Sequence, residues 1–424
     1  MTTAEAFPRF SVVVASRGRP NHLRRALRAI RQLDYPAFEI VVVGNEETLS
    51  VGRERAADGL KCVHSEQANL SIARNLGTIR SSGQFCAFID DDAVPEPMWL
   101  YHHAVGLRET EAEASVGYVR GPDGIRFQSR FETIGMDGIS TDVPVDGERA
   151  FVPEPKLSRA VKLVGTNTVV RRDVLLRLGG FDSAYRYFLE DGDLSVRLRA
   201  GGYRVAVVPL AEVHHALAAS AQRNAERGAR TLFDIGRSTA IFMRRHSDDD
   251  LEQAYDATAR RERRRLIGAM VRGLLEPRDV SRLMGTLRDG WHEGAHLALP
   301  PLRALVEAFG EGFTPVSAVP SGHHVIACRL PRRAAAIAEA RDAVAGGAGR
   351  ASVFCLSLTG LPHSVRYTEG GVWVQTGGQF VPHGTARGRF RWCRFADRIE
   401  DEKRRVAKRR GLTESTSVSG EGSP

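Results

Sequence analysis

The sequence predicts an α/β fold built on a doubly wound, mostly parallel sheet. Short apolar runs rich in β-branched residues at 10–15, 39–43 and 85–89 are separated by segments of helical spacing at 21–33 and 71–80. Runs that are apolar throughout are typical of strands buried on both faces, and their alternation with helices is typical of a parallel sheet. Ligands of such sheets bind beyond the carboxyl ends of the strands, so the residues after each run are the candidates for a site.

Further elements in the first half are weaker. Cys62 and Val63 indicate a short third strand, 161–170 a later strand, and 173–178 a short helix that ends where glycine can take the left-handed cap conformation. The segment 121–156 is rich in Gly, Pro and Asp with little periodicity, and it predicts a long loop over the substrate site.

The length of 424 residues leaves room for two or three domains. We expect a catalytic α/β domain at 1–219 and a helical extension at 220–320. A small mixed or β-containing region at 321–400 and a charged helix with a disordered tail at 401–424 would follow.

The formal net charge is +9, and the positive excess lies late in the chain. Two runs carry it: Arg260, Arg261, Arg263, Arg264 and Arg265, then Lys403, Arg404, Arg405, Lys408, Arg409 and Arg410. Such runs meet phosphates, nucleic acid or anionic lipid, or they form a solvated helix face, and the sequence leaves both readings open.

The five cysteines are scattered and odd in number, which argues against a disulfide framework or a zinc knuckle. The first residues lack the pattern of a signal peptide, and no stretch approaches the roughly 18 uncharged apolar residues of a spanning helix. We therefore expect a cytoplasmic protein that is neither secreted nor integral to a membrane.

Three adjacent acids follow an apolar run: Asp90, Asp91 and Asp92. Neighbouring carboxylates repel one another unless water or a cation compensates their charge. Oxygen-rich sites with few protein ligands suit Mg or Mn shared with phosphates. A solvated turn or a helix N-cap would explain the same acids without a metal.

A second acidic group opens a helix whose Leu194 and Leu198 share one face. It contains Glu190, Asp191 and Asp193. Acids favour helix N-termini, and Asp193 can pair with Arg197 one turn later, so we expect a structural role for Asp193.

Four segments together resemble the inverting glycosyltransferases of family 2, which have an A-type, Rossmann-like fold. They are 11–20, 69–77 (NLSIARNLG), 88–95 (FIDDDAVP) and 179–198 (GGFDSAYRYFLEDGDLSVRL). The resemblance covers about residues 9–217. It implies transfer of a sugar from a nucleotide-diphosphate sugar to an acceptor hydroxyl, with a divalent metal (Mn or Mg) and inversion at the anomeric carbon.

The resemblance also implies roles for the acids. Asp90 and Asp92 would hold the metal and the diphosphate, with Asp91 near the sugar or ribose. Asp191, paired with Glu190, would be the general base that deprotonates the acceptor. A histidine at the distance of His215, with His214 as second choice, would complete the metal coordination, although a lone histidine is more often structural.

For the nucleotide, the resemblance points to residues after the first strand and on the helix that begins near residue 70. These are Ala15, Ser16, Arg17, Arg74 and Asn75, and a surface position for Arg74 is the alternative. The family places an acidic step after the second strand, whereas this chain has Gly44, Asn45 and Glu46, so Asn45 would meet the base edge. Asn167 would line the donor and acceptor pocket or form a structural turn.

The expected partners are a nucleotide sugar and a glycan or lipid-linked acceptor, in cell-envelope polysaccharide or glycan synthesis. A nucleic-acid or anionic-surface binding protein is the alternative, but no nucleic-acid motif accompanies the charge. A sugar nucleotidyltransferase is a third possibility, but that function would not explain the acidic helix start at 190–198. Because basic and apolar residues adjoin at 260–270, peripheral contact with an anionic membrane is also expected. The oligomeric state stays open.

Overall fold

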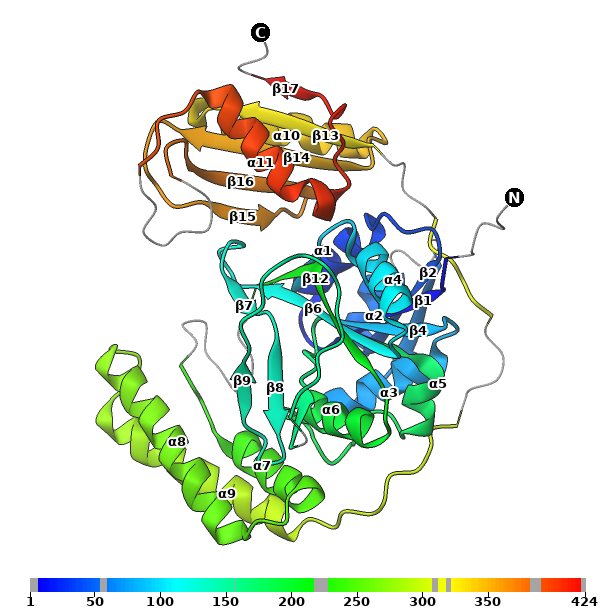
Figure 1. Ribbon diagram of the computed structural model, residues 1–424, viewed down its shortest axis with the longest axis vertical. Helices are drawn as coiled ribbons and strands as arrows, with labels where there is room; N and C mark the ends of the chain where they lie inside the picture. Colours follow the sequence, from blue (N-terminus) through cyan, green and yellow to red (C-terminus); the bar gives the residue numbers. More distant parts are fainter. Residues whose placement is uncertain are drawn as a thin grey trace.

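The computed structural model describes residues 7–53, 59–156, 158–216, 228–306, 312–317, 322–381 and 390–420. Its centre is a nine-stranded sheet in the order β3-β2-β1-β4-β11-β6-β12-β5, with β7 paired to β6 (Figure 1). The strands are β1 (Phe10–Ser16), β2 (Phe38–Gly44), β3 (Leu60–His64), β4 (Phe85–Asp90), β5 (Ala93–Pro95), β6 (Ala114–Arg120), β7 (Phe127–Ser129), β11 (Thr168–Arg171) and β12 (Val205–His215).

The sheet is mostly parallel. The four strands from β3 to β4 run parallel, β11 runs antiparallel to both of its neighbours, and β12 is parallel to β6. Strands β1 and β2 are buried over almost their whole length, and apart from Ser11, Ser16 and Glu39 they are apolar, because both of their faces are covered.

Helices cover the two faces of this sheet. They are α1 (Pro20–Arg31), α2 (Glu46–Arg53), α3 (Leu70–Arg80), α4 (Trp99–Thr110), α5 (Arg172–Arg177) and α6 (Glu190–Ala200). One apolar core joins the sheet to α1, α2 and α4, and a second core joins the opposite face to α3, α5 and α6. The predicted doubly wound α/β class is therefore confirmed.

Two sequence predictions about 121–170 were wrong. The segment 121–156 is not one loop, because it contains β7, β8 (Glu132–Gly135) and β9 (Ser140–Asp142). Strands β8 and β9 form a small sheet with β10 (Arg159–Val161), and β10 and β11 replace the single strand expected at 161–170. These strands are three or four residues long, too short for a periodic signal.

The second half contains a helical part and a second sheet (Figure 1). The helices are α7 (Phe233–His246), α8 (Leu251–Val271) and α9 (Pro277–His296). The second sheet has the order β15-β16-β14-β13-β17, from β13 (His323–Cys328), β14 (Arg350–Ser357), β15 (Ser364–Tyr367), β16 (Val372–Gly378) and β17 (Val418–Gly420). A short 3-10 turn, η2 (Leu330–Arg332), leads into α10 (Arg333–Ala345).

The second sheet is packed on both faces, by α10 on one and by α11 (Phe395–Arg410) on the other. Strand β17 lies in the tail that we expected to be disordered, and it pairs with β13 in parallel. Among the described residues, no helix combines the length and apolar character needed to cross a bilayer.

The basic run at the end of α11 fastens the second sheet to the first. Arg410 is almost fully buried and lies 3.0 Å from Glu96, while its other nitrogen donates to Ser352 on β14. Arg409 lies 2.6 Å from the buried Glu212 of β12. Part of the basic run, whose role the sequence left open, therefore forms ion pairs inside the molecule, because each of these two cations compensates a buried carboxylate.

Glu96 gives a test of this junction. Burial alone would raise the pKa of Glu96, but the charge of Arg410 and the hydrogen bond from His214 hold that pKa well below its usual range. A depressed pKa stabilises the fold above the unfolded-state value of about 4.3 and less so as the pH falls below it.

We expect Glu96→Gln to lower the free energy of unfolding by roughly 3 to 5 kcal/mol at neutral pH, because it leaves the Arg410 charge buried and unpaired. Urea unfolding of both proteins at several pH values would measure this. The difference from the wild type should narrow below about pH 4. A difference that is small, or constant across the pH range, would contradict an electrostatic role.

Candidate active site

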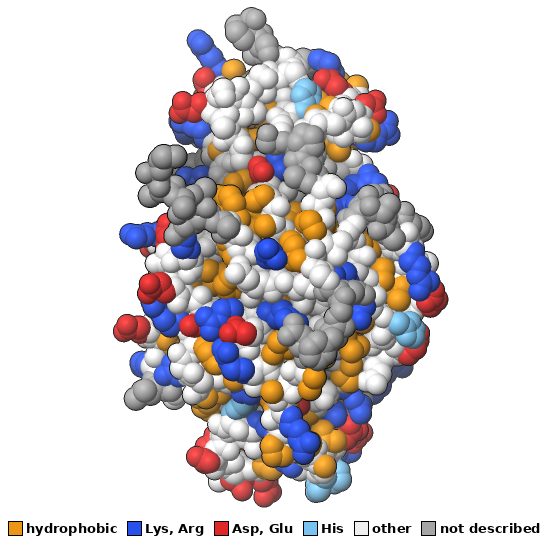
Figure 2. All heavy atoms as spheres, turned by 90° about the vertical axis from the view of Figure 1, so that its right-hand side faces the viewer, with side chains coloured by type: hydrophobic (Ala, Val, Ile, Leu, Met, Phe, Trp, Pro, Cys, Tyr) orange, Lys and Arg blue, Asp and Glu red, His pale blue; other side chains and the backbone are white. Residues whose placement is uncertain are grey.

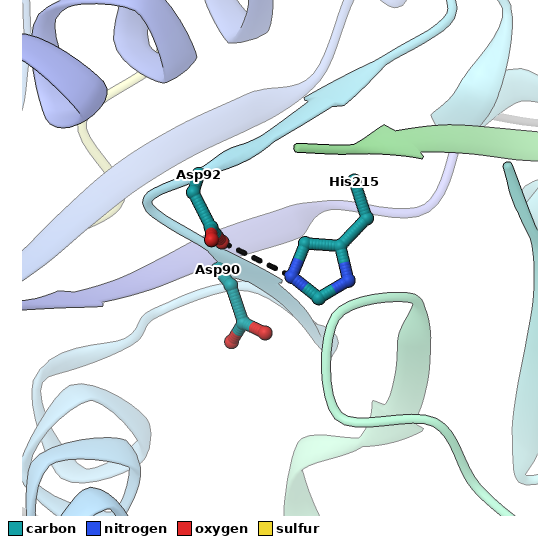
Figure 3. A group of neighbouring side chains, drawn as sticks. All are labelled: Asp90, Asp92 and His215. Carbon is teal, nitrogen blue, oxygen red and sulfur yellow. Dashed lines mark ion pairs between the residues drawn. The ribbon is translucent and has the colours of Figure 1, made fainter. Parts of the chain in front are cut away.

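Three side chains meet at the carboxyl edge of the main sheet (Figure 3). Asp90 ends β4, Asp92 lies in the turn to β5, and His215 ends β12, where it pairs with Ala93. Each offers one ligand atom, and these atoms lie within 4.8 Å of one another. His215 Nε2 is 3.1 Å from Asp92 Oδ1. The topology thus brings together residues that are far apart in sequence.

The donor set fits a divalent cation. Two carboxylates and one imidazole are ligands that Mn and Mg accept, and few protein ligands leave room for phosphate oxygens. Burial would lower the pKa of His215, but the hydrogen bond and charge of Asp92 and the charge of Asp90 raise it. A cation bound here would take the place of the proton that this surrounding favours.

The middle acid, Asp91, contacts Ser16 of β1 and Arg19, which follows that strand. It is fully buried, accepts a hydrogen bond from Ser16 Oγ at 2.6 Å, and lies 2.6 Å from an Arg19 nitrogen. Burial raises the pKa of Asp91 to about 7, while Arg19 and Ser16 oppose this shift. Ser16 therefore donates its hydroxyl hydrogen to Asp91, a contact that its position at the end of β1 did not reveal.

Arg74 connects the acid at the end of β4 with the acids at the start of α6. Its side chain is almost fully buried, with one nitrogen 3.2 Å from Asp90 Oδ1 and the other 3.1 Å from Glu190 Oε1. Helix α3 can bring it there because Gly77 packs on β1, where a Cβ would lie 2.4 Å from Val13. Arg74 is thus no surface residue, which was the alternative that the sequence left open.

Glu190 and Asp191 open α6. Both Phe188 and Leu189 have positive φ, a costly conformation that turns the chain sharply into this helix. Asp191 accepts hydrogen bonds from the backbone of Gly165 at 3.3 Å and of Gly192 at 2.7 Å. Burial, and then the charge of Asp191, raise the pKa of Glu190 to about 7.

Asp193 has the structural role expected of it. It pairs with Arg197 at 2.6 Å and with His246 of α7 at 2.8 Å. The acid therefore joins α6 to the helical part, and its side chain is saturated by these two contacts.

Several predicted site residues lie elsewhere or are occupied by structural contacts. His214 points away from the cluster: its Nε2 bonds Glu96 at 2.9 Å and its ring packs on Trp373. Successive residues of a strand face opposite sides, so only His215 reaches the acids. Asn167 is fully buried and bonds Trp99, His103, Tyr118 and Ala211, which makes it a structural residue.

Two more asparagines also form hydrogen bonds with backbone groups. Asn75 donates to Phe181 O and accepts from Phe181 N. Asn45 caps α2 through Thr48. Among the remaining nucleotide candidates, Ala15 pairs in register with Asp90, and Arg17 donates to Glu66 O on the exposed side. Sequence reasoning overlooked Arg19, although a basic residue just after the first strand was a visible signal.

The two adjacent histidines provide a matched pair of variants. We expect His215→Asn to weaken Mn binding, measured by calorimetric titration, by at least about tenfold, because one of three ligands is altered. His214→Asn should leave Mn binding near the wild-type value and lower stability instead. Equal Mn affinity in both variants and the wild type would exclude the cluster as a metal site.

Comparison with known proteins matches part of this sequence to one family. The model of "Glycosyl transferase family 2" matches residues 11–175. "Probable glycosyltransferase YdaM" of Bacillus subtilis is 29% identical over 217 residues, which cover 48% of this chain and 50% of that protein. "O-antigen biosynthesis protein RfbC" of Myxococcus xanthus is 25% identical over 236 residues, 51% of this chain and 18% of that protein.

A shorter match is closer in sequence. "N-acetylglucosaminyl-diphospho-decaprenol L-rhamnosyltransferase" of Mycobacterium tuberculosis is 41% identical over 86 residues, 20% of this chain and 27% of that protein. This chain thus spans half or less of the length of these relatives. The matched residues include Asp90 at the end of β4, Asp92 just after it and Arg74 on α3. Residues 11–175 of this chain therefore form a glycosyl transferase family 2 domain.

Proposed function

We propose that the protein is a metal-dependent inverting glycosyltransferase, which moves a sugar from a nucleotide-diphosphate sugar to an acceptor hydroxyl. The observation that carries this proposal is the span of Arg74, whose two nitrogens reach Asp90 in the metal cluster and Glu190 beside Asp191. One guanidinium thus separates a group suited to a leaving diphosphate from a group suited to a base. We propose residues 1–219 as the catalytic unit.

The metal cluster would serve the leaving group. A cation held by Asp90, Asp92 and His215 supplies charge neutralisation of the diphosphate when it is bound. Asp91, fixed by Ser16 and Arg19, lies toward β1, where the ribose of a donor would fit. Arg17 and Asn45 follow β1 and β2 and are the nearest candidates for the base, although Asn45 Oδ1 already caps α2.

Asp191 would act on the acceptor. Backbone N–H groups hold both of its oxygens, so the carboxylate has a fixed direction. It would take the proton of the acceptor hydroxyl as that oxygen attacks the anomeric carbon from the face opposite the diphosphate. One displacement of this kind inverts the configuration. Glu190, which Arg74 holds, would position its neighbour Asp191 rather than take the proton itself.

The names of three relatives support an acceptor in polysaccharide synthesis. One is an O-antigen biosynthesis protein, one acts on a decaprenol-linked sugar, and one is "Succinoglycan biosynthesis protein ExoM" of Rhizobium meliloti. We propose a glycan or lipid-linked acceptor of the cell envelope, and action at the cytoplasmic side.

Helix α8 supports peripheral contact with an anionic membrane. It exposes Val271 at 79% and Ile267 at 39% near the basic run that begins at Arg260. Apolar side chains beside cations suit the boundary between headgroups and acyl chains. On the face drawn in Figure 2, by contrast, the described basic and acidic side chains are interspersed.

Asp191→Asn tests the base. We expect kcat to fall by about two to four orders of magnitude while donor binding survives, because the amide cannot take a proton. Titration with UDP, GDP and dTDP in the presence of Mn would first identify the nucleotide, and release of that nucleotide from its sugar donor would then measure turnover. Asp193→Asn is the matched control and should lower stability without a comparable loss of kcat. Wild-type turnover in Asp191→Asn would refute the base assignment.

Sedimentation with vesicles tests the membrane contact. We expect binding to vesicles that contain phosphatidylglycerol at low salt, and a loss of roughly tenfold or more in Arg263→Glu/Arg264→Glu, since each cation near an anionic surface contributes about 1 kcal/mol. The control Arg341→Glu changes an exposed charge on α10 and should bind as the wild type does. The absence of wild-type binding at low salt would end this proposal.

A further inference from the structure

A cleft of about 770 Å³ lies between β7 and the last turns of α11. One wall comes from the main sheet and the loop that follows β6, and the other from the helix of the second sheet. Its charged lining is Arg120, Arg126, Arg130, Glu148, Arg404, Arg405, Lys408 and Arg409, with Ile125 and Phe127 between them. Seven cations and one acid line the cleft. Behind this lining, Glu212, Glu402 and Asp401 pair with four of the cations, and the positive excess that remains favours an anionic ligand.

The inner cations are fixed by carboxylates that they share. Arg120 and Arg409 both hold Glu212, at 2.5 and 2.6 Å, from opposite walls of the cleft. Lys408 and Arg409 share Glu148. Three cations thus share two carboxylates, so positive charge remains for a ligand, and the side chains are held in place before it binds.

The outer wall carries two cations that make few contacts with other described residues of the protein. Arg126 is 76% exposed and has a long contact of 3.4 Å with Asp123. Arg130 is exposed, and no ion-pair partner of its side chain lies among the described residues; its guanidinium lies 5.9 Å from the centre of the Phe127 ring. These two are the side chains that a ligand would engage at lowest cost.

Phe127 adds an apolar surface between the charges. It is 36% exposed, packs edge-on against Tyr118, and has Arg120 4.2 Å from its ring centre. An exposed aromatic ring among guanidinium groups suits a ligand with both C–H faces and anionic groups. A sugar that carries a carboxylate or phosphate has both, whereas a simple polyanion has only the second.

One loop separates the cleft from a cavity beside the metal cluster. The loop after β6 lines this cleft through Ile125 and Arg126, and it lines a smaller cavity of about 300 Å³ through Gly121 and Gly124. That second cavity also contains Asp92 and His215. A chain of sugars held in the cleft would therefore have a neighbouring unit near the cluster.

We propose that this cleft binds an acidic acceptor glycan, with Arg126, Arg130 and Phe127 as its recognition residues. The role as acceptor site rests on the proposed transferase function, but binding itself does not. The site also gives the second sheet a function, because its helix α11 supplies four of the ten lining residues.

Calorimetric titration of the full chain tests the proposal with three probes: a short oligogalacturonate, a maltooligosaccharide of the same length, and inorganic polyphosphate. We expect oligogalacturonate to bind and the neutral sugar not to. Arg126→Glu/Arg130→Glu should weaken that binding at least about tenfold, since two attractive charges become repulsive. Arg278→Glu/Arg288→Glu, an equal charge change on α9, should not weaken it.

Phe127→Ala separates a sugar site from a general anion site. It should weaken oligogalacturonate but leave polyphosphate binding unchanged. Loss of neither ligand in the Phe127 and Arg126/Arg130 variants, or binding of polyphosphate alone, would overturn the proposal. UDP binding with Mn, measured on the same variants, should stay at the wild-type value. If none of UDP, GDP and dTDP binds the wild type with Mn while the glycan binds the cleft, the transferase function fails and the glycan site stands.

Discussion

The compensation of buried negative charge at one edge of the main sheet is the constraint on which the rest of the structure depends. Asp90, Asp91 and Asp92 end one strand, and Glu190 and Asp191 open a helix beside it. Carboxylates this close would repel one another and resist burial. Two arginines form ion pairs with these carboxylates: Arg19, which precedes α1, and Arg74, which lies on α3. The positions of these helices are therefore set by electrostatics as well as by the apolar core.

The sequence was most informative where an element is long and apolar. Strands β1, β2 and β4 and helices α1 and α3 follow directly from their periodicity, and the family 2 resemblance is confirmed by the match at 11–175. Short strands such as β8 and β9 were read as loop, because three or four residues cannot show a period. Their pairing comes from contacts distant in sequence.

The site residues divide along a similar line. The structure brings Asp90, Asp92 and His215 together, as the order of the motifs suggested, and their functional roles remain proposals. Asn75 and Asn167 show what a motif cannot reveal. A side chain amide near a site can be used up by the backbone, and only the complete set of hydrogen bonds shows that these two are. The contacts of Arg410 could not be predicted either, because a run of basic residues does not reveal which acids its members pair with.

The alternation along β12 ties the site to the far end of the chain. His215 faces the acids, while its neighbour His214 faces Glu96, which Arg410 holds from α11. During synthesis from the N-terminus, the strand that carries His215 is made long before the arginine that supports its other side. Until then, Glu96 lacks its arginine partner, although its carboxylate and the His214 ring later become buried. The edge of the sheet that carries His215 therefore reaches its final packing only after Arg410 has been synthesised, so the packing of this edge depends on α11.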